Sequence, residues 1–209
     1  MILVGQYDSP FVRRVAVTLH LLGIPFERNR LSVFDPLMAE INPLVRIPSL
    51  IIDGDETLFD SAAILDYLDE LAGPQRALTP RSGEDRRRVL KATALATGAI
   101  DKAGAVVYER HFHAAPCIAH DWAARCLSQL AGVLVHLDGH AKEPWYFGGR
   151  MTQADVTIGC MIGYLNLRLA EAFPAGRYPR IEKIAERCDA LDAFIRARPA
   201  PDEVMPAKG

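Results

Sequence analysis

The sequence predicts a small α/β domain followed by an all-α helical bundle domain, and three observations lead to this prediction. Strand and helix patterns alternate over residues 1–72, a stretch rich in Gly and Pro follows at 73–83, and every later segment has apolar residues at helical spacing. We therefore expect domains at 1–75 and 86–209, joined by a linker at 76–85. Half of the 209 residues are apolar, which is enough for two cores.

The first domain is expected to follow the order β-α-β-α-β-β-α. The expected strands are 2–4, 26–33, 48–52 and 57–59, and the expected helices are 11–22, 37–41 and 61–71. Gly23 provides a stop for the first helix, and the run Asp53 to Glu56 predicts a hairpin turn between the last two strands. This order suits a small mixed sheet with helices on its faces, and it is the order of a thioredoxin-like domain.

The second domain is expected to contain helices at 86–112, 121–137, 152–172 and 181–198. The third of these is apolar nearly all round, which predicts a position in the middle of the bundle. Only the Pro-containing tail, from about Pro199, is expected to lie loose.

The overall composition excludes several classes of protein. A net charge of −2 with interleaved signs gives no reason to expect nucleic acid as the main partner. The chain shows no secretory pattern, and no apolar run is long enough to span a membrane. The four cysteines lack paired-motif spacing, so we expect reduced, mostly buried thiols and a cytoplasmic location: Cys117, Cys126, Cys160 and Cys188.

One cluster in the second domain could suggest a metal site, but its spacing argues against this. His111, His113, Cys117 and His120 match no standard ligand pattern, and Pro116 interrupts any common helical face. We expect no metal.

The residues that carry chemistry stand at three junctions in the first domain. Ser9 is a strong N-cap and Pro10 suits the first helical position, so the junction either only caps the helix or also binds an anion at its positive end. Asp60 and Ser61 stand at a second helix start, with the same two alternatives. Pro48 enters a strand, either as a plain trans edge proline or as a cis proline that exposes the preceding backbone to a ligand.

These junctions carry a resemblance to a known family. The segments SPFVRRV (9–15), NP (42–43) ahead of RIPSL (46–50), and DSAAI (60–64) resemble, in order and spacing, motifs of the glutathione transferase family. The segment GGRMTQADV (148–156) resembles the buried capping box of the family's helical domain, in which Thr152 caps the helix and Asp155 reaches back to the Thr152 N–H. The resemblance runs from residue 1 to about 198. It implies a dimer and glutathione as co-substrate.

The resemblance implies a role for a hydroxyl group at the glutathione sulfur. Ser9 would donate a hydrogen bond to the thiolate, and Tyr7 is the alternative because some branches of the family use Tyr. Ser9 is preferred because it stands at the helix cap.

The resemblance also implies a set of residues that bind the rest of the tripeptide. The backbone of Ile47, beside a cis Pro48, would pair with the cysteinyl main chain, and Asp60 and Ser61 would hold the γ-glutamyl end. Arg46 would approach the glycine carboxylate. This chain departs from the common family pattern at Val45, where Gly is frequent, at Arg46, where Lys is usual, and at Asp60, where Glu is commoner.

The implied reaction is transfer of the glutathione sulfur to an electrophilic, apolar small molecule. Phe11, Tyr108 and Phe112 would line the pocket for this second substrate, although core or dimer contacts would explain the last two equally well. The alternatives are a glutathione-dependent isomerase, dehalogenase or peroxidase, or a protein of this fold that has lost catalysis and acts as a binding partner.

Overall fold

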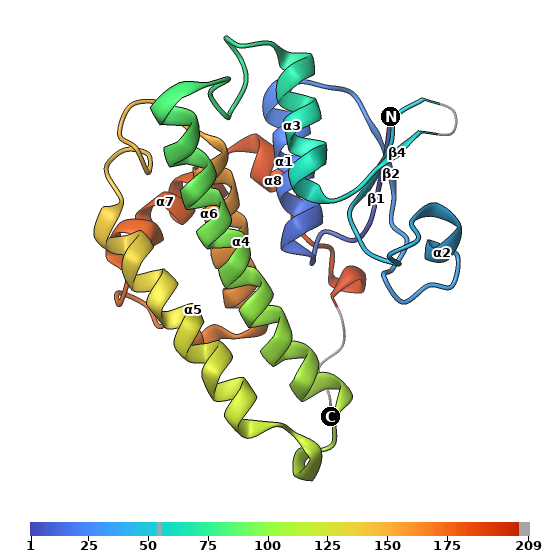
Figure 1. Cartoon of the computed structure of the whole chain (residues 1–209), viewed down its shortest axis with the longest axis vertical. Helices are drawn as coiled ribbons and strands as arrows, with labels where there is room; N and C mark the ends of the chain where they lie inside the picture. The colour runs from blue at the N-terminus through green and yellow to red at the C-terminus, as the bar shows by residue number, and fades with distance from the viewer. Residues whose placement is uncertain (54–55, 205–209) are drawn as a thin grey trace. The chain divides into compact units, whose positions relative to one another are not determined.

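The structure is a computed structural model that describes residues 1–53 and 56–204. The chain forms two compact units. The first contains residues 1–86 together with the described residues from 190 onward, and the second contains residues 87–189. The sheet lies in the first unit, whereas the second unit is helical (Figure 1).

The sheet has the strand order β2-β1-β3-β4. Its strands are β1 (Ile2–Val4), β2 (Glu27–Asn29), β3 (Ser49–Ile51) and β4 (Thr57–Leu58), and only the β1–β2 pair is parallel. The second strand is much shorter than the predicted 26–33, because the Asn29 side chain accepts the Leu31 N–H at 3.2 Å and turns the chain. β3 and β4 pair antiparallel as expected, and residues 54–55 of the predicted turn lie outside the described residues.

Three helices of the first unit match the predicted positions within one residue at each end: α1 (Pro10–Leu22), α2 (Met38–Ile41) and α3 (Ser61–Ala72). α1 ends at Gly23, whose φ of 63° is left-handed and favours glycine. α1 and α3 pack against each other on one side of the sheet, and α2 lies beyond the other side (Figure 1). Val15, Leu19 and Ile64 are fully buried in the core between them and the sheet.

The predicted final helix at 181–198 is wrong as a single element. The chain forms α7 (Pro179–Asp189) and then α8 (Asp192–Arg196), because Leu191 between them is extended, with φ −78° and ψ 140°. α8 packs on α1 in the first unit and buries Phe194 completely. The burial of Phe194 explains why the chain leaves the helical unit at this point.

The prediction of a loose tail from Pro199 is also wrong for the described part of that segment. Pro201–Glu203 forms a 3-10 turn, η3, and Glu203 is 2% exposed. A buried carboxylate needs hydrogen-bonded or charged partners, which hold the segment in place.

The second unit consists of helices around one central helix. Its elements are α4 (Gly83–Phe112), η1 (Ala115–Cys117), α5 (His120–His140), α6 (Gln153–Arg168), η2 (Ala170–Ala172) and α7. α6 is buried continuously from Gln153 to Ile162 and packs on α7, which confirms the predicted central helix. α6 ends before Leu169, whose φ of −151° is not helical, so the predicted 152–172 is a helix followed by η2.

The capping interaction predicted at the start of α6 is confirmed. Asp155, which is fully buried, accepts the Thr152 N–H at 2.8 Å and the Thr152 hydroxyl at 2.9 Å. Its other oxygen accepts the Tyr146 N–H at 2.6 Å. Burial raises the pKa of Asp155, and the hydrogen bonds from Tyr146 and Thr152 act in the opposite direction.

All four cysteines are free thiols, as expected, and only Cys117 is exposed. Within residues 1–53 and 56–204, the helices are too short or too polar to cross a bilayer.

Candidate functional site

The topology of the first unit brings the three predicted junctions to one end of the sheet. Val4, at the end of β1, faces Ser49, at the start of β3, and Leu58, at the end of β4, faces Leu50. The chain leaving β1 toward α1, the chain entering β3, and the chain leaving β4 toward α3 are therefore neighbours.

Gly5 shows how closely two of these segments approach each other. A side-chain Cβ at Gly5 would lie 2.6 Å from Cγ2 of Val12 in α1 and 3.0 Å from Cβ of Ile47. Gly5 also has a φ of 134°, which other residues rarely adopt. Only glycine allows the first turn of α1 and the residue before Pro48 to pack against the end of β1.

Ser9 occupies the N-cap of α1, and Pro10 is the first helical residue. The Ser9 hydroxyl oxygen accepts the Val12 N–H at 3.5 Å, a long contact, and the side chain is half-buried. Among the described residues, no acceptor is present for the Ser9 hydroxyl proton. The hydroxyl can therefore donate to an anion that binds at this helix end, where free N–H groups also point.

Ile47 precedes a cis proline, which confirms the cis alternative for Pro48. β3 is an inner strand rather than an edge strand, and Pro48 stands just before it, so no ladder hydrogen bond is lost. Within the described part of the chain, neither the N–H nor the C=O of Ile47 is used in a hydrogen bond. Such a backbone can pair with an extended peptide as a further strand would.

Asn42 fixes the loop that carries Ile47. Its side-chain amide donates to the Arg46 carbonyl at 2.9 Å and to the Ser49 hydroxyl at 3.1 Å, and its carbonyl oxygen accepts the Leu44 N–H at 2.9 Å. Asn42 is 1% exposed, whereas Arg46 is exposed. Val45 in this loop has a φ of 50°, which explains why glycine suits the position.

Asp60 is the N-cap of α3 and Ser61 its first residue, and the two differ in burial. The Asp60 carboxylate accepts the Ala62 N–H at 2.8 Å and is exposed, whereas Ser61 is 2% exposed. The Ser61 hydroxyl accepts two hydrogen bonds from Arg14, at 2.9 and 3.2 Å, and donates to Asp60 at 3.3 Å. The buried Arg14 therefore ties α1 to the start of α3 and adds positive charge beneath it.

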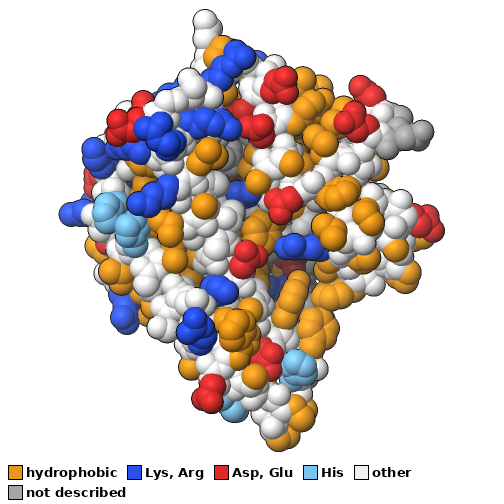
Figure 2. All heavy atoms as spheres, in the orientation of Figure 1, with side chains coloured by type: hydrophobic (Ala, Val, Ile, Leu, Met, Phe, Trp, Pro, Cys, Tyr) orange, Lys and Arg blue, Asp and Glu red, His pale blue; other side chains and the backbone are white. Residues whose placement is uncertain are grey.

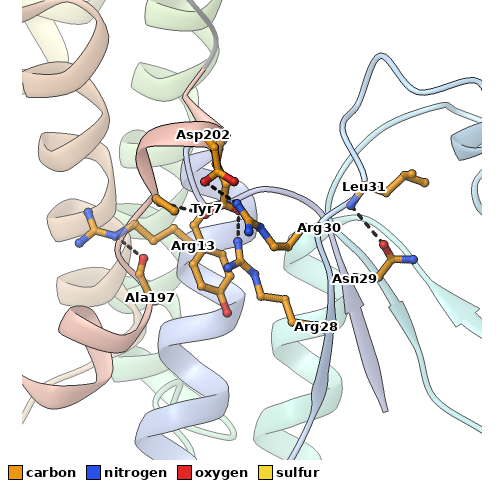
Figure 3. Close-up of polar contacts among 10 residues, drawn as sticks. Tyr7, Arg13, Arg28, Asn29, Arg30, Leu31, Ala197 and Asp202 are labelled. Carbon is orange, nitrogen blue, oxygen red and sulfur yellow. Dashed lines mark hydrogen bonds and ion pairs between the residues drawn. The ribbon is translucent and has the colours of Figure 1, made fainter.

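The Tyr7 side chain is buried and packs against Arg28 of β2. It is 4% exposed and lines a cavity together with Leu19 and His20, which belong to the last turn of α1. The Arg28 guanidinium lies 3.3 Å from the centre of the Tyr7 ring (Figure 3). Burial raises the pKa of Tyr7, which makes ionisation of this phenol less favourable.

The three residues predicted for a second-substrate pocket belong to different units. Phe11, in the first turn of α1, is half-buried. Tyr108 and Phe112, near the end of α4, are 46% and 53% exposed and meet edge to face at 5.7 Å between ring centres. These two rings are not core residues of the helical unit, and their role in a substrate pocket stays a prediction.

Among the residues that the structure describes, no group of three or more His, Cys, Asp or Glu side chains is arranged to hold a metal ion. His113 instead contacts Glu109 at 3.0 Å, one turn earlier in α4.

Comparison with known proteins places the chain in a family. Residues 3–76 match the model of the glutathione S-transferase N-terminal domain, and residues 121–197 match that of the C-terminal domain. The GST-like protein YibF of Escherichia coli (strain K12) is 34% identical over 202 residues, which cover 95% of this chain and 98% of the relative. The chain belongs to the glutathione S-transferase family.

Solved structures agree with this assignment. A glutathione S-transferase from Methylobacterium radiotolerans in complex with glutathione sulfonate has a TM-score of 0.90 at 25% identity, covering 100% of this chain and 99% of its own. One from Methylobacillus flagellatus with glutathione bound has a TM-score of 0.89 at 28% identity, covering 95% and 99%. The maleylacetoacetate isomerase of Pseudomonas aeruginosa is 28% identical over 217 residues, covering 99% of this chain and 100% of the relative.

Two residues that organise the site were missed by sequence reasoning. Arg14 and Asn42 belong to the family motifs, but no role was predicted for either. Both are buried, and their hydrogen bonds hold the segments that meet at this end of the sheet. A second arginine on an otherwise apolar helix could have indicated a buried cation, but its partner Ser61 lies 47 residues away. No local pattern indicates such a pair.

Proposed function

We propose that this protein is a glutathione transferase in which Ser9 stabilises the glutathione thiolate for attack on an electrophilic, apolar small molecule. The observation that supports this most directly is the Ser9 hydroxyl. It stands at the start of α1 with its proton available, and the segment that carries the unused backbone of Ile47 reaches the same end of the sheet.

The energetics of this role are reasonable. A thiol with a pKa of about 8.5 is only about 3% ionised at pH 7, and lowering that pKa by two units requires about 2.7 kcal/mol. A hydrogen bond to a charged group contributes about 1.5–3 kcal/mol, and a helix N-terminus about 0.3–1 kcal/mol. These contributions cover the requirement without a general base. The first turn of α1 contains no acidic residue, whereas Asp8, next to Ser9 in the sequence, would oppose ionisation of the thiol.

The rest of the site suits the remaining groups of the tripeptide. The cysteinyl main chain would pair with Ile47, and the γ-glutamyl carboxylate would meet the start of α3, where Arg14 supplies positive charge. The Ser61 hydroxyl already accepts a hydrogen bond from Arg14 and donates one to Asp60. The main-chain N–H of Ser61 is therefore the better donor to the γ-glutamyl carboxylate. Asp60 would receive the α-amino group, and exposed Arg46 would approach the glycine carboxylate.

The test compares wild-type protein with Ser9→Ala. Calorimetry measures glutathione binding, and conjugation of a generic aryl halide measures turnover. We expect Ser9→Ala to bind glutathione with similar affinity but to lose about 100-fold or more in kcat, because the hydrogen bond acts on the thiolate. A pH–rate profile would shift to a higher apparent pKa.

Tyr7→Phe is the matched control, because it removes the rival hydroxyl and keeps the ring under Arg28. We expect this variant to retain turnover. If Tyr7→Phe loses turnover and Ser9→Ala keeps it, the assignment of Ser9 is wrong. If wild-type protein fails to bind glutathione at millimolar concentration, the enzyme proposal fails and a binding-partner role replaces it.

A second candidate is glutathione-dependent isomerisation, supported by full-length similarity to the maleylacetoacetate isomerase of P. aeruginosa. The same thiolate would add to a conjugated double bond and then leave, so Ser9 keeps its role. The two candidates separate when aryl-halide conjugation and isomerisation of maleylacetoacetate are measured on one preparation.

The electrophile, the assembly and the location are part of this proposal. Phe11, Tyr108 and Phe112 would contact the apolar substrate, and a glutathione binder of this family would work as a homodimer. We place the protein in the cytoplasm, where free thiols such as the exposed Cys117 persist.

A further inference from the structure

The helical unit contains a small cavity whose charged lining is entirely basic. Its volume is about 240 Å³, and α4, α5 and the following loop surround it. The lining side chains are Arg88, Lys91, Ala92, Leu95, His136, His140, Lys142, Tyr146 and Phe147. No carboxylate is among them, and Figure 2 shows Lys and Arg side chains gathered beside His over the start of α4 and the end of α5.

Two of these cations lack a counter-charge of their own. Neither the Lys91 nor the Lys142 ammonium group takes part in an ion pair or a side-chain hydrogen bond with another residue in the described part of the chain. The acid next to Lys142, Glu143, instead holds Lys183 at 2.9 Å and Arg187 at 3.4 Å. Like charges gathered without a counter-ion repel one another, and a bound anion would relieve that repulsion.

A pair of histidines lies among these cations. His136 and His140 stack at 4.2 Å between ring centres, and Nδ1 of His140 lies 2.8 Å from the His136 carbonyl oxygen. Burial lowers the pKa of His136, and repulsion from His140 and Lys91 lowers it further. An anion beside these rings would favour their protonated forms.

One wall of the cavity is apolar and aromatic. Ala92 is buried, Leu95 and Phe147 are half-buried, and the Arg88 guanidinium lies 5.1 Å from the centre of the Phe147 ring. This stacking holds a cation at the rim of an apolar surface. A ligand that matches both features carries a multiply charged anionic group on a small ring.

We propose that this cavity binds a small aromatic dianion, of the phosphomonoester class, with its ring on the apolar wall and its charged group among Lys91, Lys142 and the histidine pair. The cavity is built from the helical unit alone. The proposal is therefore independent of the glutathione site. A negative result for this cavity would not contradict the proposed transferase activity, and the reverse also holds.

The test is calorimetric titration of the full chain, without glutathione, with three probes at constant ionic strength. Phenyl phosphate carries the dianion and the ring, inorganic phosphate carries only the dianion, and benzoate carries the ring with a single charge. We expect phenyl phosphate to bind at least about fivefold more tightly than either of the others, because it alone uses both the charges and the wall.

The variants test whether binding occurs in this cavity. Lys91→Gln combined with Lys142→Gln should weaken phenyl phosphate binding by about tenfold or more. Lys183→Gln is the matched control, since its ammonium group is already neutralised by Glu143, and it should leave binding unchanged. Circular dichroism and thermal unfolding check that all variants fold.

A pH series gives a second readout. The charged or titratable groups that face His136 are Arg88 and Lys91 from α4, His140 from α5, and Lys142 and Tyr146 from the loop. Because burial and the neighbouring cations lower the pKa of His136, a dianion bound beside this ring should raise that pKa, and an NMR titration of the His136 ring with and without phenyl phosphate measures the change. Equal affinity for the three probes, binding that survives the double substitution, or no binding at millimolar phenyl phosphate would each overturn the proposal.

Discussion

Each unit contains a deeply buried carboxylate that accepts several hydrogen bonds, Asp155 in the helical unit and Glu203 in the unit with the sheet. The donors to Asp155 come from Thr152 and Tyr146, within nine residues. Glu203 accepts the Tyr7 N–H, 196 residues away, at 3.3 Å and pairs with Arg28. Both carboxylates close a local turn, since Glu203 also accepts the Ala200 N–H at 2.9 Å, but Glu203 adds partners near the start of the chain.

The C-terminal segment, residues 190–204, contacts residues on both sides of Ser9. Figure 3 shows Arg13 beside Ala197 and Arg30 beside Asp202 of this segment; Arg13 Nε donates to the Ala197 carbonyl at 3.1 Å, and the Tyr7 N–H donates to Glu203. Tyr7 and Arg13 stand before and after Ser9 in the sequence. The C-terminal segment therefore contacts the junction between β1 and α1 on both sides of Ser9, the proposed thiolate-binding residue.

The largest effect is expected when the Asp155 carboxylate is removed. Asp155→Ala leaves three donors without an acceptor inside the protein and should lower the free energy of unfolding by about 3–5 kcal/mol. Urea unfolding followed by circular dichroism measures it. Asp192→Ala, at a side chain that is 82% exposed, is the control and should change stability little. Equal effects of the two substitutions would show that burial of the capping carboxylate is unimportant.

These carboxylates also show which parts of the molecule can be predicted from sequence. The cap at Thr152 and Asp155, the start of α1 at Ser9 and the stop at Gly23 follow from residues close together in the chain, because local hydrogen bonds determine them. The division of the last helix at Leu191 and the anchoring of Glu203 depend on partners near the other end of the chain. The resemblance at three junctions located the candidate site, but not Arg14 and Asn42 beneath it.

The next largest effect is expected when the charge of Glu203 is removed. Glu203→Gln leaves one acceptor oxygen for the Tyr7 and Ala200 N–H groups and removes the charge that faces Arg28, and it should lower the free energy of unfolding by about 2 kcal/mol. Asp202→Asn is the matched control, because its side chain is 69% exposed and solvent screens its contact with Arg30. Limited proteolysis should release the C-terminal segment faster in Glu203→Gln than in Asp202→Asn. The reverse order would show that Glu203 does not anchor it.

A smaller effect concerns alkaline stability and the residue that donates to Asp155. Burial, with a further contribution from Asp155, raises the pKa of Tyr146 to about 12, above its ordinary value of 10.0. The unfolded chain therefore loses this proton first, so stability is unaffected below pH 10 and falls between pH 10 and 12. Tyr146→Phe should lose less stability over this interval than wild-type protein. Parallel curves for the two proteins, from urea unfolding at each pH, would contradict the assignment.

The smallest effect is expected at Val45, in the loop held by Asn42, and it has the opposite sign. Val45 is 41% exposed, so a substitution removes little packing, while its φ of 50° is unfavourable for a β-branched residue. Relief of about 1–2 kcal/mol of backbone strain should exceed the roughly 0.5–1 kcal/mol that glycine costs in conformational entropy. Val45→Gly should therefore raise the free energy of unfolding by about 0.5–1 kcal/mol. Val45→Ala, which keeps the side-chain Cβ, should raise it less, and a loss of stability in Val45→Gly would show that packing of Val45 outweighs its conformation.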